Sequence, residues 1–300
     1  MLTLEHLADL AAGHPAALRA RVAEFEVKGR RLAFNERPAL MGVVNLSPDS
    51  WYRESVVLSA EAAVERALVL AAQGADIIDL GAESTLAHAA RAGTELQSSR
   101  LLPVVRELAG RGIPVSVETY TPAVARACLE AGAAVLNLTG TDPTEEMFRL
   151  AAAHEAAVIL CHVQGEHVRA VGDFEFGADP VAGMQDFFAR QIGRATRCGV
   201  TRLLVDPGLG FYYRNLQDSA VRVRHQMRVF LNTFRLRTLG WPVCHALPHA
   251  FEFFGEEVRS AEPFFAVLAA LGRTDLLRTH EVPRTRAVLR TLGAFAEPAR

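Results

Sequence analysis

The stretch MGVVNLSPDS at residues 41–50 decides the expected fold, because it reads as an apolar strand that stops at Asn45 and turns sharply at Pro48. The segment ADIIDLGAEST at residues 75–85 repeats this pattern, and its apolar run leads into polar residues up to Thr85. Two strands therefore place polar groups at their carboxyl ends. In parallel barrels, the active-site residues lie at these ends of the strands.

Short β-rich runs alternate with Ala/Leu-rich helical stretches from residue 39 onward, which indicates βα units around a parallel sheet. Eight candidate strands lie at residues 39–45, 76–81, 113–119, 134–140, 157–162, 202–208, 242–247 and 276–280. Eight βα units close a barrel more naturally than they extend an open sheet. We therefore expect an α/β fold, a single-domain TIM (β/α)8 barrel over residues 39–300, with residues 1–38 forming a helix and a cap over the barrel floor.

Expected helices between these strands follow the usual start and stop rules. Residues 59–75 begin with a serine cap and end near Gly74, and residues 121–133 begin with Thr-Pro and end at Gly132. No repeat, linker or low-complexity segment points to a second domain.

The composition excludes several classes of function. Half of the 300 residues are apolar and the formal net charge is −2. The charged residues form no long runs of one sign, so the chain does not resemble a nucleic-acid-binding protein. No stretch reaches the ~18 apolar residues of a membrane span, and the first residues lack the apolar core of an export signal. The four cysteines lie far apart, without a CxxC pair. We expect a cytoplasmic protein that binds neither nucleic acid nor membrane.

Polar residues stand at the carboxyl end of every expected strand. In chain order they are Asn45, Glu83 with Thr85, Glu118 with Thr119, Asn137, His162, Asp206, His245, and Arg278 with His280. A barrel brings such ends together at one mouth, so these groups are expected to converge there. His154 and His225, within expected helices, are interpreted as solvated surface residues.

Carboxylate and amide groups from three of these strands suit a flat heterocycle with several N–H donors. Glu118, Asn137 and Asp206 supply them. A buried carboxylate that faces an amino-pyrimidine edge can accept two charge-assisted hydrogen bonds. This half of the mouth is expected to bind the heterocycle.

The other half of the mouth is expected to bind an anion. Arg278, His280 and Asn45 meet where the last strand closes on the first. Barrels of this kind commonly hold phosphate in that region.

Six motifs, in this order and spacing, resemble those of the dihydropteroate synthase family. They are NLSPDS (45–50), DLGAEST (79–85), VETYTPAVA (117–125), LNLTG (136–140), LVDPGLGF (204–211) and RTHEV (278–282). The resemblance implies a TIM barrel that joins p-aminobenzoate to 6-hydroxymethyl-7,8-dihydropterin pyrophosphate in folate biosynthesis. It further implies pyrophosphate release assisted by Mg²⁺, and a homodimer.

The resemblance also assigns roles to individual positions. The pterin-binding positions are Glu118, Asn137, Asp206, Phe211 and His249. The catalytic positions are Asn45, Arg278 and His280, with Asn45 as the expected Mg²⁺ ligand. The anion- and substrate-binding loop positions are Ser47, Pro48, Asp49 and Thr85; the loop around Ser47, Pro48 and Asp49 is expected to close over the reacting groups, and Thr85 matches the threonine of the family's EST segment.

Three departures from the family pattern fall on these positions. Glu118 stands where the family has aspartate, and its extra methylene is expected to push the carboxylate roughly 1 Å into the pterin slot, a shift that can lower a rate on the order of 10²-fold. Pro248 and His249 occupy the place of the family's Ser-Arg-Lys, and Leu86 that of an arginine that contacts pyrophosphate. A histidine can still donate one hydrogen bond, but it is shorter than lysine and only partly charged near neutral pH.

Three functions stay open at this point. The first is a synthase in which Glu118 and His249 substitute acceptably. The second is a diverged paralogue, such as a pterin-dependent methyltransferase, in which Arg278 and His280 would have little purpose. The third is a non-catalytic pterin-binding protein, which the loss of the lysine and of the arginine at Leu86 favours.

Overall fold

The computed structural model describes most of the chain. The described residues are 1–47, 56–57, 59–83, 92–140, 144–165, 167–168, 171–211, 213–216 and 218–295. Among them, none of the helices combines the length and the hydropathy that a bilayer crossing demands.

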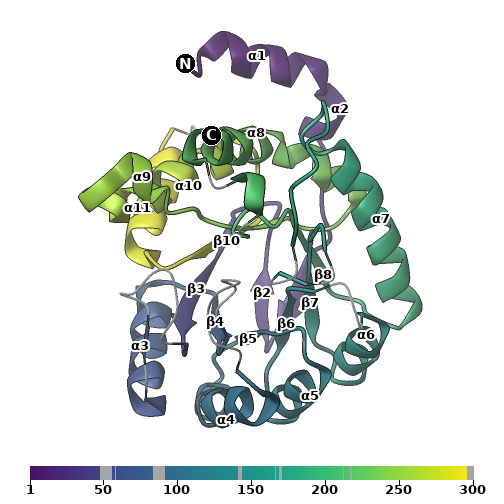
Figure 1. The fold of residues 1–300 in the computed structure, drawn as a ribbon, viewed down its shortest axis with the longest axis vertical. Coiled ribbons are helices and arrows are strands. Elements are labelled where there is room, and N and C mark those ends of the chain that lie inside the picture. The colour runs from purple at the N-terminus through teal and green to yellow at the C-terminus, as the bar shows by residue number, and fades with distance from the viewer. Residues whose placement is uncertain are drawn as a thin grey trace, which may run out of the picture.

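The described residues form eight parallel strands around one barrel, in the order β8-β7-β6-β5-β4-β3-β10-β9 (Figure 1). The strands are β3 (Ala39–Asn45), β4 (Ile77–Gly81), β5 (Val115–Glu118), β6 (Val135–Leu138), β7 (Ala157–Cys161), β8 (Leu203–Asp206), β9 (Cys244–Ala246) and β10 (Leu276–Thr279). A hydrogen bond of 3.0 Å from the Val205 N–H to the Pro242 carbonyl joins the two ends of the sheet. The predicted TIM barrel is confirmed, with each strand within two residues of its expected bounds.

Helices surround the barrel, and α1 lies beyond α8, outside this ring (Figure 1). They are α1 (Leu4–Gly13), α2 (Pro15–Leu18), α3 (Ala60–Gln73), α4 (Thr94–Gly110), α5 (Pro122–Glu130), α6 (Thr144–Ala153), α7 (Ala182–Arg197), α8 (Ser219–Leu236), α9 (Phe251–Phe254), α10 (Ala261–Leu271) and α11 (Val282–Gly293). Helix α3 begins where the Ser59 hydroxyl accepts a 3.2 Å hydrogen bond from the Ala62 N–H, and it ends at Gly74, whose φ of 109° needs glycine.

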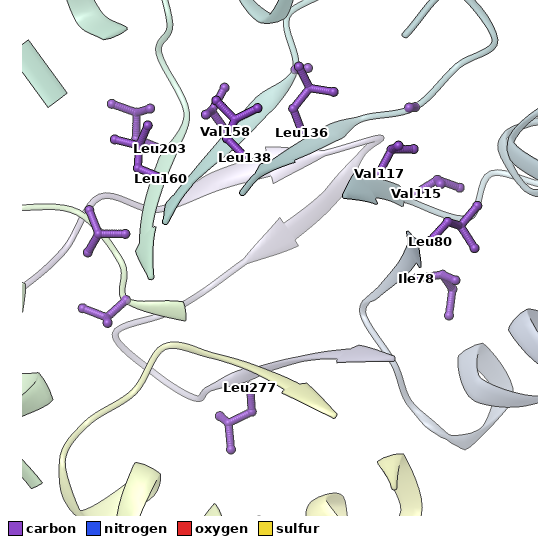
Figure 2. Packing of buried hydrophobic residues seen from close by; sticks show 14 of the residues in the cluster. Ile78, Leu80, Val115, Val117, Leu136, Leu138, Val158, Leu160, Leu203 and Leu277 are labelled. Atoms are coloured by element: carbon purple, nitrogen blue, oxygen red, sulfur yellow. The ribbon is translucent and has the colours of Figure 1, made fainter. Parts of the chain in front are cut away.

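Alternation along each strand builds the core in two layers. Outward side chains such as Ile78, Leu136 and Leu277 pack against the helices, and Figure 2 shows them on the outer side of the strands. Each such side chain stabilises the fold by roughly 1.5–3 kcal/mol when fully buried. Because successive residues of a strand face opposite sides, the residues between these point inward. Met41 and Ile77 belong to an inner apolar cluster, whereas Asn137 and Asp206 line the mouth.

A hairpin lies across the barrel floor (Figure 1). Its strands, β1 (Phe25–Val27) and β2 (Arg30–Leu32), pair antiparallel. Val27 and Leu32 are buried and belong to the same apolar cluster as the inward-facing Met41 of β3. The hairpin thus excludes water from the end of the barrel that lies opposite the polar mouth.

Candidate active site

One cavity opens at the carboxyl ends of the strands. Ten of the positions expected from the sequence line it: Asn45, Ser47, Glu83, Glu118, Asn137, Asp206, Phe211, His249, Arg278 and His280. Five of them lie on strands, and the other five lie in segments that follow strands. Pro48, Asp49, Thr85 and Leu86 lie outside the described residues.

Arg278 holds the centre of the cavity through two short ion pairs. Its Nε lies 2.6 Å from Asp79 Oδ2, and one terminal nitrogen lies 2.6 Å from Glu118 Oε2. The Asp79 side chain is fully buried and that of Glu118 is 12% exposed, so these charges interact in a poorly solvated environment. The Glu118 carboxylate thus contacts the guanidinium directly.

Burial raises the pKa of both carboxyls on the pterin side. For Glu118, burial and neighbouring carboxylates outweigh the opposing charge of Arg278, and its pKa is about 7. For Asp206, burial raises the pKa to about 6, although the Gly208 N–H donates a 2.8 Å hydrogen bond to its carboxylate. Two acidic side chains with pKa values near neutrality face one cavity, which is typical of functional sites.

The turn after β8 explains how Asp206 is presented. Gly208 has a φ of +73°, and a Cβ there would lie 2.2 Å from the His162 carbonyl oxygen, so only glycine fits. The same turn brings Phe211 to the wall of the cavity that Asp206 also lines. An apolar ring and a hydrogen-bond acceptor are thus available to one planar ligand.

The amide of Asn137 is oriented by its neighbours on the barrel interior. Its Nδ2 lies 3.5 Å from Asp79 Oδ2, and its Oδ1 lies 3.5 Å from the Cys161 sulfur. The side chain is buried, so its position is fixed before any ligand enters.

The other side of the cavity contains a histidine that is held by a buried carboxylate. His280 Nδ1 lies 2.7 Å from Glu262 Oε1, and His280 Nε2 lies 3.5 Å from Asn45 Nδ2. Burial alone would raise the pKa of Glu262, but the charge and hydrogen bond of His280 help to hold it at about 2. His249 also faces this carboxylate, and burial, reinforced by the charge of His280, lowers its pKa to about 4.

Three expectations about histidines are wrong. His162 packs against Phe187, with ring centroids 4.9 Å apart, on the side away from the mouth. His245 is fully buried and pairs with the Thr233 hydroxyl at 2.8 Å. Alternation explains both errors, because the inward positions are the neighbouring Cys161 and Ala246. His225 is not a solvated surface residue, since its ring packs 4.7 Å from that of Phe174 and burial lowers its pKa to about 4.

Two residues of the site were not predicted from the sequence. Asp79 is a charged residue inside an apolar strand, and this isolated charge was the signal that could have identified it. Glu262 lies near the start of α10 rather than at a strand end, so the pattern of polar strand ends does not predict it.

Comparison with known proteins agrees with the geometry. The family model described as pterin binding enzyme matches residues 41–254. The chain is 30% identical over 273 residues to dihydropteroate synthase type-2 of Escherichia coli, which covers 89% of this chain and 99% of that protein. It is 31% identical over 275 residues to the probable bifunctional folylpolyglutamate synthase/dihydropteroate synthase of Haloferax volcanii, covering 89% of this chain but spanning only 32% of that longer protein.

A solved structure gives the same result at the level of the fold. Dihydropteroate synthase from Xanthomonas albilineans, in complex with 7,8-dihydropteroate, superposes with a TM-score of 0.74 and 30% identity, covering 92% of this chain and 100% of that one. The family model spans well over half of the chain, and the Escherichia coli relative is matched along almost its whole length. The chain belongs to the dihydropteroate synthase family of pterin binding enzymes.

Proposed function

We propose that this chain condenses 6-hydroxymethyl-7,8-dihydropterin pyrophosphate with p-aminobenzoate in folate biosynthesis. The observation that carries the proposal is the convergence of a carboxylate-amide wall and a cationic wall on one cavity. A pterin pyrophosphate has a matching division, with a flat ring of N–H donors at one end and an anion at the other.

The pterin ring is assigned to the wall of Asn137 and Asp206. The buried carboxylate accepts two N–H groups from the amino-pyrimidine edge, and the amide contributes a donor and an acceptor. Phe211 provides an apolar face beside them. Glu118 supplies a further carboxylate at the same wall, held by its ion pair with Arg278.

The pyrophosphate is assigned to Arg278, His280 and Asn45. In the condensation, the bond from the pterin methylene carbon to the pyrophosphate oxygen breaks, and a bond from that carbon to the p-aminobenzoate nitrogen forms. The amine loses one proton, and the electron pair of the broken carbon–oxygen bond leaves with pyrophosphate. Cationic donors fixed near the departing oxygens stabilise the charge that develops there.

We include Mg²⁺ in the proposal because the residues present fit it. A Cβ at Gly81 would lie 3.7 Å from Asn45 Oδ1 and 3.8 Å from Glu118 Oε2, so glycine leaves space between two oxygen donors. Mg²⁺ prefers such oxygens and is commonly completed by water and substrate phosphates. When bound, it would neutralise part of the pyrophosphate charge.

A second candidate function is pterin binding without condensation. The 2.6 Å contact between Arg278 and Glu118 favours it, because a guanidinium that already holds two carboxylates has less charge to offer a leaving anion.

Pyrophosphate release distinguishes the two. Wild-type protein with both substrates and Mg²⁺ is expected to release one pyrophosphate for each dihydropteroate formed. Asp206→Asn should weaken pterin binding roughly 10- to 150-fold, since a hydrogen bond to a charged group contributes about 1.5–3 kcal/mol. The matched control is Asp186→Asn, on the exposed side of α7. Binding without release would favour the second candidate, and failure to bind the pterin would refute both.

The remaining proposals rest on the family resemblance. We propose a homodimer in the cytoplasm, with residues 39–300 as the catalytic barrel and residues 1–38 as its cap. Analytical ultracentrifugation measures the oligomeric state directly, and a monomer at micromolar concentration would contradict it.

A further inference from the structure

Three segments far apart in the sequence bring nitrogen and carboxylate ligands together beside the cavity. His249 follows β9, Glu262 lies near the start of α10, and His280 follows β10. One ligand atom from each lies within 4.8 Å of the other two. Their side chains are 13%, 1% and 11% exposed, respectively.

The carboxylate of Glu262 is anchored on one side and faces the two imidazoles on the other. Its Oε2 accepts hydrogen bonds from the backbone N–H groups of His280 at 2.9 Å and Glu281 at 3.1 Å, and also from the Thr279 hydroxyl. Its Oε1 accepts a longer bond, at 3.2 Å, from the same His280 N–H, and it lies 2.7 Å from His280 Nδ1 and 3.6 Å from His249 Nδ1. The 3.6 Å distance exceeds that of a hydrogen bond. Such anchoring of one oxygen is what supports a carboxylate that binds a metal through the other.

We propose that His249, Glu262 and His280 form a binding site for one divalent transition-metal ion of the Zn²⁺ type. Two imidazoles and one carboxylate are the ligand set of open zinc sites and of related transition-metal centres, whereas Mg²⁺ prefers oxygen ligands. In a tetrahedral zinc site, ligand atoms lie about 3.4 Å apart, because each metal–ligand bond is about 2.0–2.2 Å long. The 3.6 Å separation is close to this value, and the two imidazole nitrogens lie within 4.8 Å of each other. The 2.7 Å pair must open by roughly 0.7 Å when the metal replaces the shared proton, which passes to solvent.

The position of the cluster at the cavity wall would let a metal ion enter from the mouth and restrain catalytic side chains. His249 and His280 both line the cavity, so an ion can enter from the mouth, and a fourth ligand can bind on that side. The bound ion would tie the segment after β9 to α10 and β10. It would also fix the His280 ring, whose Nε2 faces Asn45. This site is distinct from the oxygen-lined space beside Gly81.

Calorimetric titration of the EDTA-treated full-length chain with Zn²⁺ tests the proposal. We expect one ion per chain, bound on the order of 100-fold more tightly than Mg²⁺. His249→Ala should weaken Zn²⁺ binding by about 100-fold or more, since even supporting residues of a metal site contribute about 10- to 100-fold. His154→Ala, which removes an exposed histidine beyond the end of α6, is the matched control and should leave binding unchanged. Because no pterin is present, the result is independent of whether the chain condenses its proposed substrates.

Cobalt gives a second readout that does not depend on stability. Co²⁺ in a site with two imidazoles and a carboxylate should produce visible absorption bands of four- or five-coordinate geometry, and these bands should vanish in His249→Ala and Glu262→Gln. The His249 variant carries the test if the Glu262 variant does not fold. Equal Zn²⁺ affinity in the wild type and His249→Ala, or Co²⁺ bands of hexa-aqua type, would overturn the proposal.

Discussion

Replacing Arg278 with methionine should lower the free energy of unfolding by about 3–5 kcal/mol at pH 8.5. This is the usual effect of removing one partner from a buried ion pair, because the remaining charge stays buried without compensation. Here the arginine holds two carboxylates, each at 2.6 Å, and the Asp79 side chain is fully buried. Methionine fills a similar volume, so the change reports the charge rather than a cavity.

The loss should also depend on pH, for a reason that concerns Glu118. Burial raises its pKa to about 7, from an ordinary value of 4.5, and the charge of Arg278 opposes that rise. Without the arginine, the folded-state pKa of Glu118 should move further up. A carboxyl with a raised folded-state pKa contributes stability below its unfolded pKa and loses that stability as the pH rises through the folded value. Between pH 7 and 8.5 the wild-type stability has levelled off with respect to Glu118, whereas the variant goes on losing stability, which adds about 1–2 kcal/mol to the difference at a slope of about 1.4 kcal/mol per pH unit.

Urea unfolding at pH 6.0 and pH 8.5, followed by circular dichroism, measures both effects. Arg149→Met is the control, because Arg149 pairs at 2.9 Å with Glu145 one helical turn away, and both side chains are more than half exposed, at 66% and 51%. Its loss should be about 0.3–0.5 kcal/mol at either pH. A loss below about 1 kcal/mol for Arg278→Met at pH 8.5, or an equal loss at the two pH values, would show that the buried carboxylates do not depend on this arginine.

Two further predictions concern ligand binding and packing. The affinity for the pterin substrate should rise as the pH increases from 5 to about 8 and then level off, because Asp206, with a pKa of about 6, and Glu118, with a pKa of about 7, accept ring N–H groups only when ionised; calorimetry across this range checks it, and a flat profile would contradict it. Gly272→Ala should destabilise the fold by about 1–3 kcal/mol or more, since a Cβ there would lie 1.8 Å from the Phe230 carbonyl oxygen, whereas Gly293→Ala, with nothing within 4 Å, should change the melting temperature little.

The barrel and the pterin-binding side of the mouth could be predicted from the sequence, because both follow from the alternation of side chains along strands. Asn137 and Asp206 occupy inward positions at strand ends, so pattern and geometry agree. The prediction for His162 was wrong because successive strand residues face opposite sides. Cys161 takes the inward position and lines the cavity, so the neighbouring His162 does not. Glu262 could not be predicted, since only the packing of α10 against the end of β10 brings it to His280.

The contacts of Arg278 reconcile the Glu118 departure with a working anion site. A guanidinium carries five N–H donors in a planar fork. Nε reaches Asp79 and one terminal N–H reaches Glu118, which leaves N–H groups on both terminal nitrogens for an anion. A shorter aspartate at position 118 would reach less far toward the guanidinium, and arginine would then be held on one side only. The longer glutamate therefore restrains the arginine between two carboxylates while its remaining donors can still meet pyrophosphate. Neutralising Glu118 should release this restraint, so Glu118 affects both the orientation of Arg278 and the charge that Arg278 can offer an anion.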